Sequence, residues 1–101
     1  MYFMAVQRWP LSASEQVGKV AVENLRNPPK DYYKRIGPFT MFTDEGVKSY
    51  LLYEVEDGRE GDAIKYWADV YMSFKAIEGY SIVFEPLLAV DDALALLGLK
   101  L

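Results

Sequence analysis

The chain of 101 residues has 51% hydrophobic and 26% charged residues, which predicts one folded domain over residues 1–101 and not a disordered segment. It has no cysteine and no histidine, so disulfides, thiolate nucleophiles, zinc–thiolate sites, histidine-ligated metals and serine–histidine–aspartate triads are excluded. The net charge of −4 argues against a nucleic-acid partner or an anionic membrane surface.

The N-terminal segment Tyr2–Trp9 predicts a first strand, which Pro10 ends because proline donates no ladder hydrogen bond. Its apolar start is short and lacks a basic leader, so it is interpreted as a strand and not as a signal peptide. No apolar run approaches the ~20 residues that span a bilayer. We therefore expect a soluble cytoplasmic protein.

A helix is predicted after Pro10. Ser12 and Glu15 match a capping box, in which each side chain accepts a hydrogen bond from the other residue's backbone N–H. An apolar stripe at helical spacing follows, made of Val17, Val20, Ala21 and Leu25. The Asn-Pro-Pro segment at 27–29 ends this helix.

The second predicted strand is Ile36–Thr43, reached through a basic connection at Lys30–Arg35. Pro38 lies inside the strand and removes a ladder donor, which predicts a sheet edge. The turn that follows, Asp44–Gly46, is typical of a hairpin because Gly46 readily adopts a positive φ. The strands on either side of this turn should therefore pair antiparallel.

The third predicted strand, Ser49–Val55, is the one around which we expect the sheet to be organised. Aromatic and β-branched residues suit a pleated surface, and apolar residues stand at both alternating positions along it. This pattern predicts a central strand that is buried on both faces.

A second helix is predicted over Arg59–Glu78. A stripe recurs there at helical spacing, made of Ile64, Trp67, Ala68, Tyr71 and Phe74 or Lys75. Gly79 is a natural helix stop. The segment between Glu54 and Asp62 is rich in acidic residues but lacks the spacing of a calcium-binding loop, so no metal site is expected.

The chain is predicted to close with a fourth strand and a short helix. The strand is Tyr80–Leu88, and Pro86 predicts that it also lies at an edge. The helix is Ala93–Leu97, with Asp91 or Asp92 as its cap and Gly98 closing it.

This order predicts an α+β domain with the ferredoxin-like β-α-β-β-α-β arrangement plus a short C-terminal helix. Two helices cover one sheet face, and a second copy of the chain is the simplest cover for the other. Residues 1–52 carry a net charge of +2 (7 basic, 5 acidic) and residues 53–101 carry −6 (4 basic, 10 acidic). This asymmetry suits head-to-tail pairing of two copies, although solvated faces explain it equally well.

The layout resembles the dimeric α+β barrel superfamily, in which two ferredoxin-like subunits pack sheet to sheet. Three stretches are similar to small uncharacterised families such as the DUF3303-like proteins: Tyr2–Trp9, Tyr50–Asp57 and Ile82–Leu94. The superfamily holds cofactor-independent monooxygenases, lactone isomerases, haem enzymes, stress-induced proteins and ligand-sensing modules. The resemblance therefore implies a dimer with a ligand cleft, without naming the ligand.

Candidate site residues follow from strand alternation. If Leu51, Tyr53 and Val55 face the helices, then Lys48, Tyr50, Leu52 and Glu54 face the dimer interior, and the opposite alternation would exchange the two sets. From the first strand, either Arg8 or Trp9 joins the interior set. These side chains combine an apolar surface with a few polar groups, which suits a small ligand.

Two of these residues suggest chemistry. Glu54 is a candidate base with a raised pKa, or a partner of Arg8 or Lys48 in the interior. The alternative is a partly exposed acid at the strand end or a structural ion pair across the dimer. Tyr50 is a candidate hydrogen-bond donor to a developing enolate, or else packing in the core or interface.

We therefore expect a homodimer that binds a small, partly apolar ligand without a cofactor, through Arg8, Trp9, Lys48, Tyr50 and Glu54. One alternative is a cofactor-independent monooxygenase or isomerase of a small aromatic or lactone-like compound, using Tyr50, Glu54 and Arg8. The other is a structural or regulatory interaction protein whose aromatic residues only pack.

Overall fold

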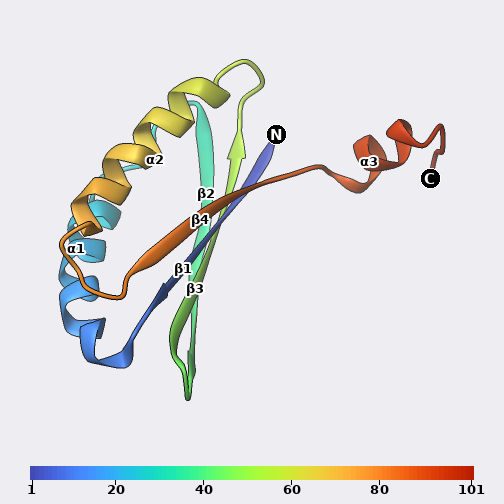
Figure 1. Ribbon diagram of the computed structural model, residues 1–101. Coiled ribbons are helices and arrows are strands. Elements are labelled where there is room, and N and C mark those ends of the chain that lie inside the picture. Colours follow the sequence, from blue (N-terminus) through green and yellow to red (C-terminus); the bar gives the residue numbers. More distant parts are fainter.

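The computed structural model describes residues 1–101 (Figure 1). Its elements are β1 (Tyr2–Trp9), the 3-10 turn η1 (Leu11–Ala13), α1 (Ser14–Arg26), β2 (Tyr33–Thr43), β3 (Gly46–Val55), α2 (Glu60–Phe74), β4 (Ser81–Leu87) and α3 (Val90–Leu96). The strands form one antiparallel sheet in the order β2-β3-β1-β4. Helices α1 and α2 lie on one face of the sheet, and α3 stands apart (Figure 1). The α+β class and the element order are confirmed and are compatible with a ferredoxin-like fold.

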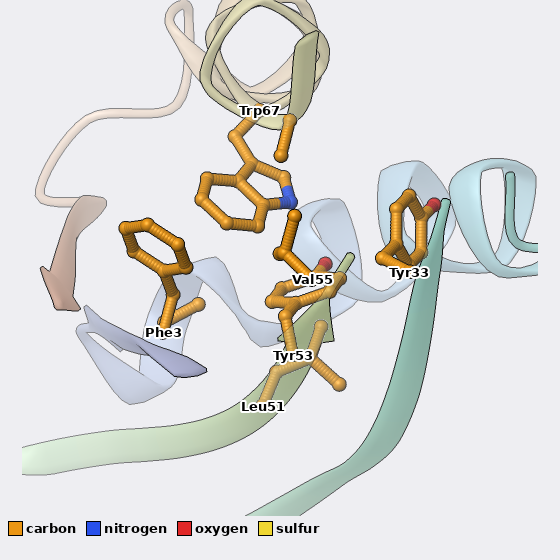
Figure 2. Packing of buried hydrophobic residues seen from close by; sticks show 8 residues of the cluster. Phe3, Tyr33, Leu51, Tyr53, Val55 and Trp67 are labelled. Atoms are coloured by element: carbon orange, nitrogen blue, oxygen red, sulfur yellow. The ribbon is translucent and has the colours of Figure 1, made fainter. Parts of the chain in front are cut away.

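The core lies between α2 and the two central strands, and Trp67 is at its centre. Its indole is 1% exposed, and the centroid of its ring lies 4.8 Å from that of Phe3 and 4.9 Å from that of Tyr53. Figure 2 shows this ring descending from α2 between the two strand aromatics. Full burial of so large a side chain stabilises the fold by about 3–5 kcal/mol, the loss that is typical when a buried tryptophan is truncated to alanine.

A second cluster fills the space between α1 and the end of α2. It consists of Ala13, Val17, Phe74 and Ile77. Phe74 stacks on Tyr80 at a centroid distance of 4.5 Å, which links the end of α2 to the start of β4. The two clusters together hold both helices on the same sheet face.

Alternation along β3 separates the two faces of the sheet. Its odd-numbered residues from Val47 to Val55 are buried against the helices, while Lys48, Tyr50, Leu52 and Glu54 are only half-buried. The prediction that this strand is buried on both faces is therefore wrong for a single chain. The helices cover one face, and nothing in the chain covers the other, which we call the open face.

The edge positions of β2 and β4 are confirmed, as Pro38 and Pro86 predicted. Strand β2 starts earlier than expected because Tyr33, Lys34 and Arg35 pair with the end of β3. Pro38 lies in the register break between Ile36 and Phe39, where its missing N–H is not needed for strand pairing.

Four local predictions are wrong in whole or in part. The capping box at Ser12 and Glu15 is not formed, because the chain first makes a 3-10 turn and α1 then starts at Ser14 without a side-chain cap. Helix α2 ends at Phe74, five residues before Gly79. Of its predicted stripe, Trp67 and Phe74 are buried together with Ala63, whereas Ile64, Ala68 and Tyr71 face outward. Helix α3 begins at Val90, ahead of the predicted aspartate caps.

Candidate functional site on the open sheet face

The open face carries four rows of side chains, defined by the strand register. In the order β2-β3-β1-β4 they are a first row of Lys34, Glu54, Tyr2 and Leu87, a second of Ile36, Leu52, Met4 and Glu85, a third of Phe39, Tyr50, Val6 and Val83, and a fourth of Met41, Lys48, Arg8 and Ser81. The two middle rows are almost entirely apolar, and Phe39 within them is 65% exposed. An apolar surface of this kind on a small domain is typical of an interaction site.

The fourth row contains two cations side by side. Arg8 and Lys48 are Cα partners across β1 and β3. The ion pairs of the chain lie elsewhere, and neither residue has a carboxylate within 4.0 Å. Lys48 Nζ lies 5.2 Å from the centroid of the Tyr50 ring, a cation–π contact along the same face of β3.

A hollow of about 950 Å³ opens at this end of the sheet, and we call it the basic-row hollow. Its wall includes Arg8, Met41, Lys48 and Tyr50 from the open face. It also includes Trp9 at the end of β1, and Pro10 and Gly79 from the adjoining connections. Asp44 and Glu45 of the β2–β3 turn line its rim, so the hollow combines positive and negative groups. It is large enough for a small organic ligand.

The structure brings three of the predicted site residues together on the open face. Arg8, Lys48 and Tyr50 occupy two neighbouring rows and line the same hollow. Trp9 also borders the hollow, but its ring belongs to the helix side of the sheet. There its indole N–H donates a hydrogen bond of 3.1 Å to Ser14 Oγ, and the ring stacks on Tyr80.

Glu54 lies on the open face but at the opposite end. It follows Tyr50 by four residues on β3, a separation of about 13 Å along the strand. Its Oε1 atom accepts a hydrogen bond of 3.5 Å from the Tyr2 hydroxyl, and its cross-strand partner on β2 is Lys34. Within one chain, Glu54 therefore does not share a site with Tyr50 and Arg8.

Sequence reasoning missed an apolar cavity on the helix side, beneath α1. It has a volume of about 270 Å³, and its wall includes Val17, Leu51 and Phe74. Ser49 also lines it and is buried, accepting a hydrogen bond of 3.2 Å from the Thr40 hydroxyl. The available signal was a serine at a core-facing position of β3. That hydroxyl already has a partner, so it is not a free group for a ligand.

Two further observations describe the chemistry of the fold. No group of three acidic side chains is arranged to hold a metal ion. None of the helices has the length and apolar content that crossing a bilayer requires.

Comparison of the chain with family models, with curated proteins and with solved structures gave no match.

Proposed function

We propose that the protein is a homodimer that packs through its open face and binds a small, partly apolar ligand between the two sheets. The observation that carries this proposal is the pair of apolar middle rows left uncovered on a sheet whose other face holds both helices. Two sheets that pack face to face bury such rows at a spacing of about 10 Å.

Charge favours one orientation of the two copies. A two-fold axis running across the strands reverses the rows, so that the fourth row of one copy faces the first row of the other. Lys48 then faces Glu54 of the partner subunit. A two-fold axis running along the strands would instead place the cationic fourth rows of both copies together, which costs free energy because like charges repel at short range. We therefore propose the reversed stacking.

The ligand site follows from this stacking. The basic-row hollow becomes enclosed between the copies, with Met41 as apolar wall and Lys48 and Tyr50 as hydrogen-bond donors. Such a site suits an aromatic or similar compact molecule with one acceptor oxygen, because desolvated donors favour an oxygen that accepts from both.

The stacking also bears on the catalytic alternative. It brings Glu54 of the partner subunit to the same hollow as Tyr50 and Arg8, the three residues that a cofactor-independent oxygenase or isomerase would use. Measuring turnover distinguishes the two functions. A binding protein is stabilised by its ligand and forms no product. An enzyme forms product, and Tyr50→Phe or Glu54→Gln abolishes that activity while the fold stays intact.

Thermal unfolding with benzoate and with its neutral counterpart benzamide tests the ligand site. A ligand that binds only the native state at 100 times its Kd adds about 2.7 kcal/mol of stability. We expect stabilisation of the wild-type protein that is reduced in Tyr50→Phe and preserved in the control Tyr71→Phe, which alters an exposed tyrosine on α2. Equal stabilisation of both variants would place the ligand elsewhere and overturn this site.

A further inference from the structure

The last fourteen residues, 88–101, form a C-terminal arm that stands clear of the sheet on the side away from α1 and α2 (Figure 1). The arm is rich in leucine, and its side chains are open to solvent. Leu96 is 78% exposed, Leu97 73% and Leu101 90%. No residue of α3 is buried.

A seven-residue helix that packs against nothing is not stable by itself. Helix nucleation is costly, and isolated helices shorter than ~12–15 residues are marginal in water, so a short helix depends on packing against a partner. The arm also extends the molecule: the radius of gyration is 15.3 Å, against about 13 Å for a globular chain of this length. The arm therefore has an apolar surface and no partner within its own chain.

We propose that the arm of each copy packs on the other copy and closes the basic-row hollow there. This inference rests on the reversed stacking of the proposed dimer. Strand β4 runs from Ser81 in the fourth row to Leu87 in the first row. In the reversed stacking Leu87 lies over Ser81 of the partner subunit, so the arm continues past that residue toward its neighbour Arg8, which lines the hollow.

Charge and apolar surface both match at this position. Asp91 and Asp92, at the start of α3, are exposed and have no ion pair, and the same is true of Arg8 in the hollow. The arm thus brings two carboxylates to an arginine that lacks an acidic partner in its own chain. The leucines beyond them meet Met41 and Pro10, which are apolar parts of the hollow's wall.

The consequence concerns the ligand site. Arg8 pairs with the arm, whereas Tyr50 stays available to the ligand, and Lys48 can donate to the ligand as well as to Glu54 of the partner subunit. Each hollow is then completed by the other chain, and ligand entry requires the arm to move. A monomer would have neither the lid nor the opposite wall.

Cross-linking tests the arm directly, because the chain has no native cysteine. The variant carries Val90→Cys on the arm and Ser81→Cys beside Arg8. Within one copy, Ser81 starts β4 and Val90 lies three residues beyond its end, so the length of the strand, about 20 Å, lies between them and a short bismaleimide links them only between copies. The matched control carries Val90→Cys with Lys19→Cys, an exposed position on α1.

We expect a cross-linked dimer band with Val90→Cys/Ser81→Cys at least ten times stronger than with the control. A protein that sedimentation shows to be dimeric, but that gives equal bands in both variants or none, overturns the arm inference and leaves the dimer standing. A protein that sediments as a monomer overturns the dimer and the arm together. The two failures are therefore distinguishable.

Discussion

Arg8 and Lys48 face each other across β1 and β3, on the open side of the sheet, and neither has an acidic partner in the chain. Like charges placed directly opposite on neighbouring strands destabilise a sheet by a few tenths of a kcal/mol to about 1 kcal/mol. An anionic group brought by a second molecule relieves this repulsion. The pair therefore fixes the expected orientation of the partner and makes that orientation testable.

A charge exchange tests the reversed stacking. Lys48→Glu and Glu54→Lys should each weaken dimerisation about tenfold or more at low salt, because each places like charges across the interface. The double variant should recover most of the wild-type Kd, measured by sedimentation equilibrium. If the dimerisation free energy of the double variant falls by the sum of the two single losses, Lys48 does not face Glu54 of the partner subunit.

Placing a charge in the apolar middle rows should separate the copies without unfolding them. Leu52→Lys buries an ammonium at the centre of the proposed interface, and we expect the dimer to weaken by about 100-fold or more. The helical circular dichroism should persist, since Leu52 points away from the helix-side core. Ile64→Lys, at an outward position of α2, is the matched control and should remain dimeric. Dissociation of both variants, or of neither, would count against the open face as the interface.

Truncating the central indole tests the core. Trp67→Ala should lower the free energy of unfolding by about 3–5 kcal/mol, because it empties the space between Phe3 and Tyr53. Urea denaturation followed by circular dichroism gives this value. Met72→Ala, which alters an exposed residue of the same helix, should change stability by less than about 0.5 kcal/mol. A loss below 1 kcal/mol for Trp67→Ala would contradict this description of the core.

Two glycine-to-alanine changes should have opposite signs. Gly46 has a φ of +132°, and an added Cβ would lie 2.6 Å from the Trp9 carbonyl oxygen, so Gly46→Ala should destabilise the chain by about 1–3 kcal/mol or more. Gly61 lies within α2 with nothing within 4 Å of an added Cβ, so Gly61→Ala should stabilise it by about 0.5–1 kcal/mol. Thermal melts of both variants check the prediction. A stabilised Gly46→Ala would show that the hairpin end differs from the structure described.

Stability should fall at alkaline pH. Burial raises the pKa of Tyr53 and of Tyr80 above the value of about 10 expected in the unfolded chain. The folded state then holds these protons more tightly, so their contribution is complete below pH ~10 and is lost above it, by up to about 1.4 kcal/mol per pH unit for each tyrosine. Chemical denaturation from pH 8 to 12 measures this slope. It should be shallower in Tyr53→Phe, and an unchanged slope would contradict the assignment.

Local sequence signals predicted the strands well because the properties that define a strand, such as a missing N–H donor, belong to single residues. Pro38 and Pro86 cannot donate within a ladder, and both strands that contain them lie at edges. The start of α1 depended instead on hydrogen bonds with residues that precede the helix. Near the start of α1, the Ser14 hydroxyl accepts the Trp9 indole N–H, and Ala13 N–H bonds the Pro10 carbonyl, neither of which a capping pattern reveals.

The orientation of α2 was ambiguous in the sequence because the helix carries two apolar stripes. One, with Ile64, Ala68 and Tyr71, faces outward, and the other, with Ala63 and Trp67, enters the core. Periodicity alone does not distinguish them. Small Ala63 beside large Trp67 is the arrangement that fits closely against the sheet.

The site was predictable only in part. Strand alternation indicates which face a residue occupies, and this brought Arg8, Lys48 and Tyr50 together. It says nothing of position along the strand, which is why Glu54 was grouped with residues that lie at the other end of the sheet. The turn residues and Gly79 that complete the hollow come from connections far apart in sequence.

Native mass spectrometry of the freshly purified wild-type protein tests the central claim most directly, because one spectrum reports both the number of subunits and any ligand retained. We expect a dimer at micromolar concentration, with twice the chain mass of 11.6 kDa, and additional small mass on the dimer alone where ligand remains bound. A monomer at the same concentration would contradict the dimer through the open face, and with it the proposed ligand site and the arm.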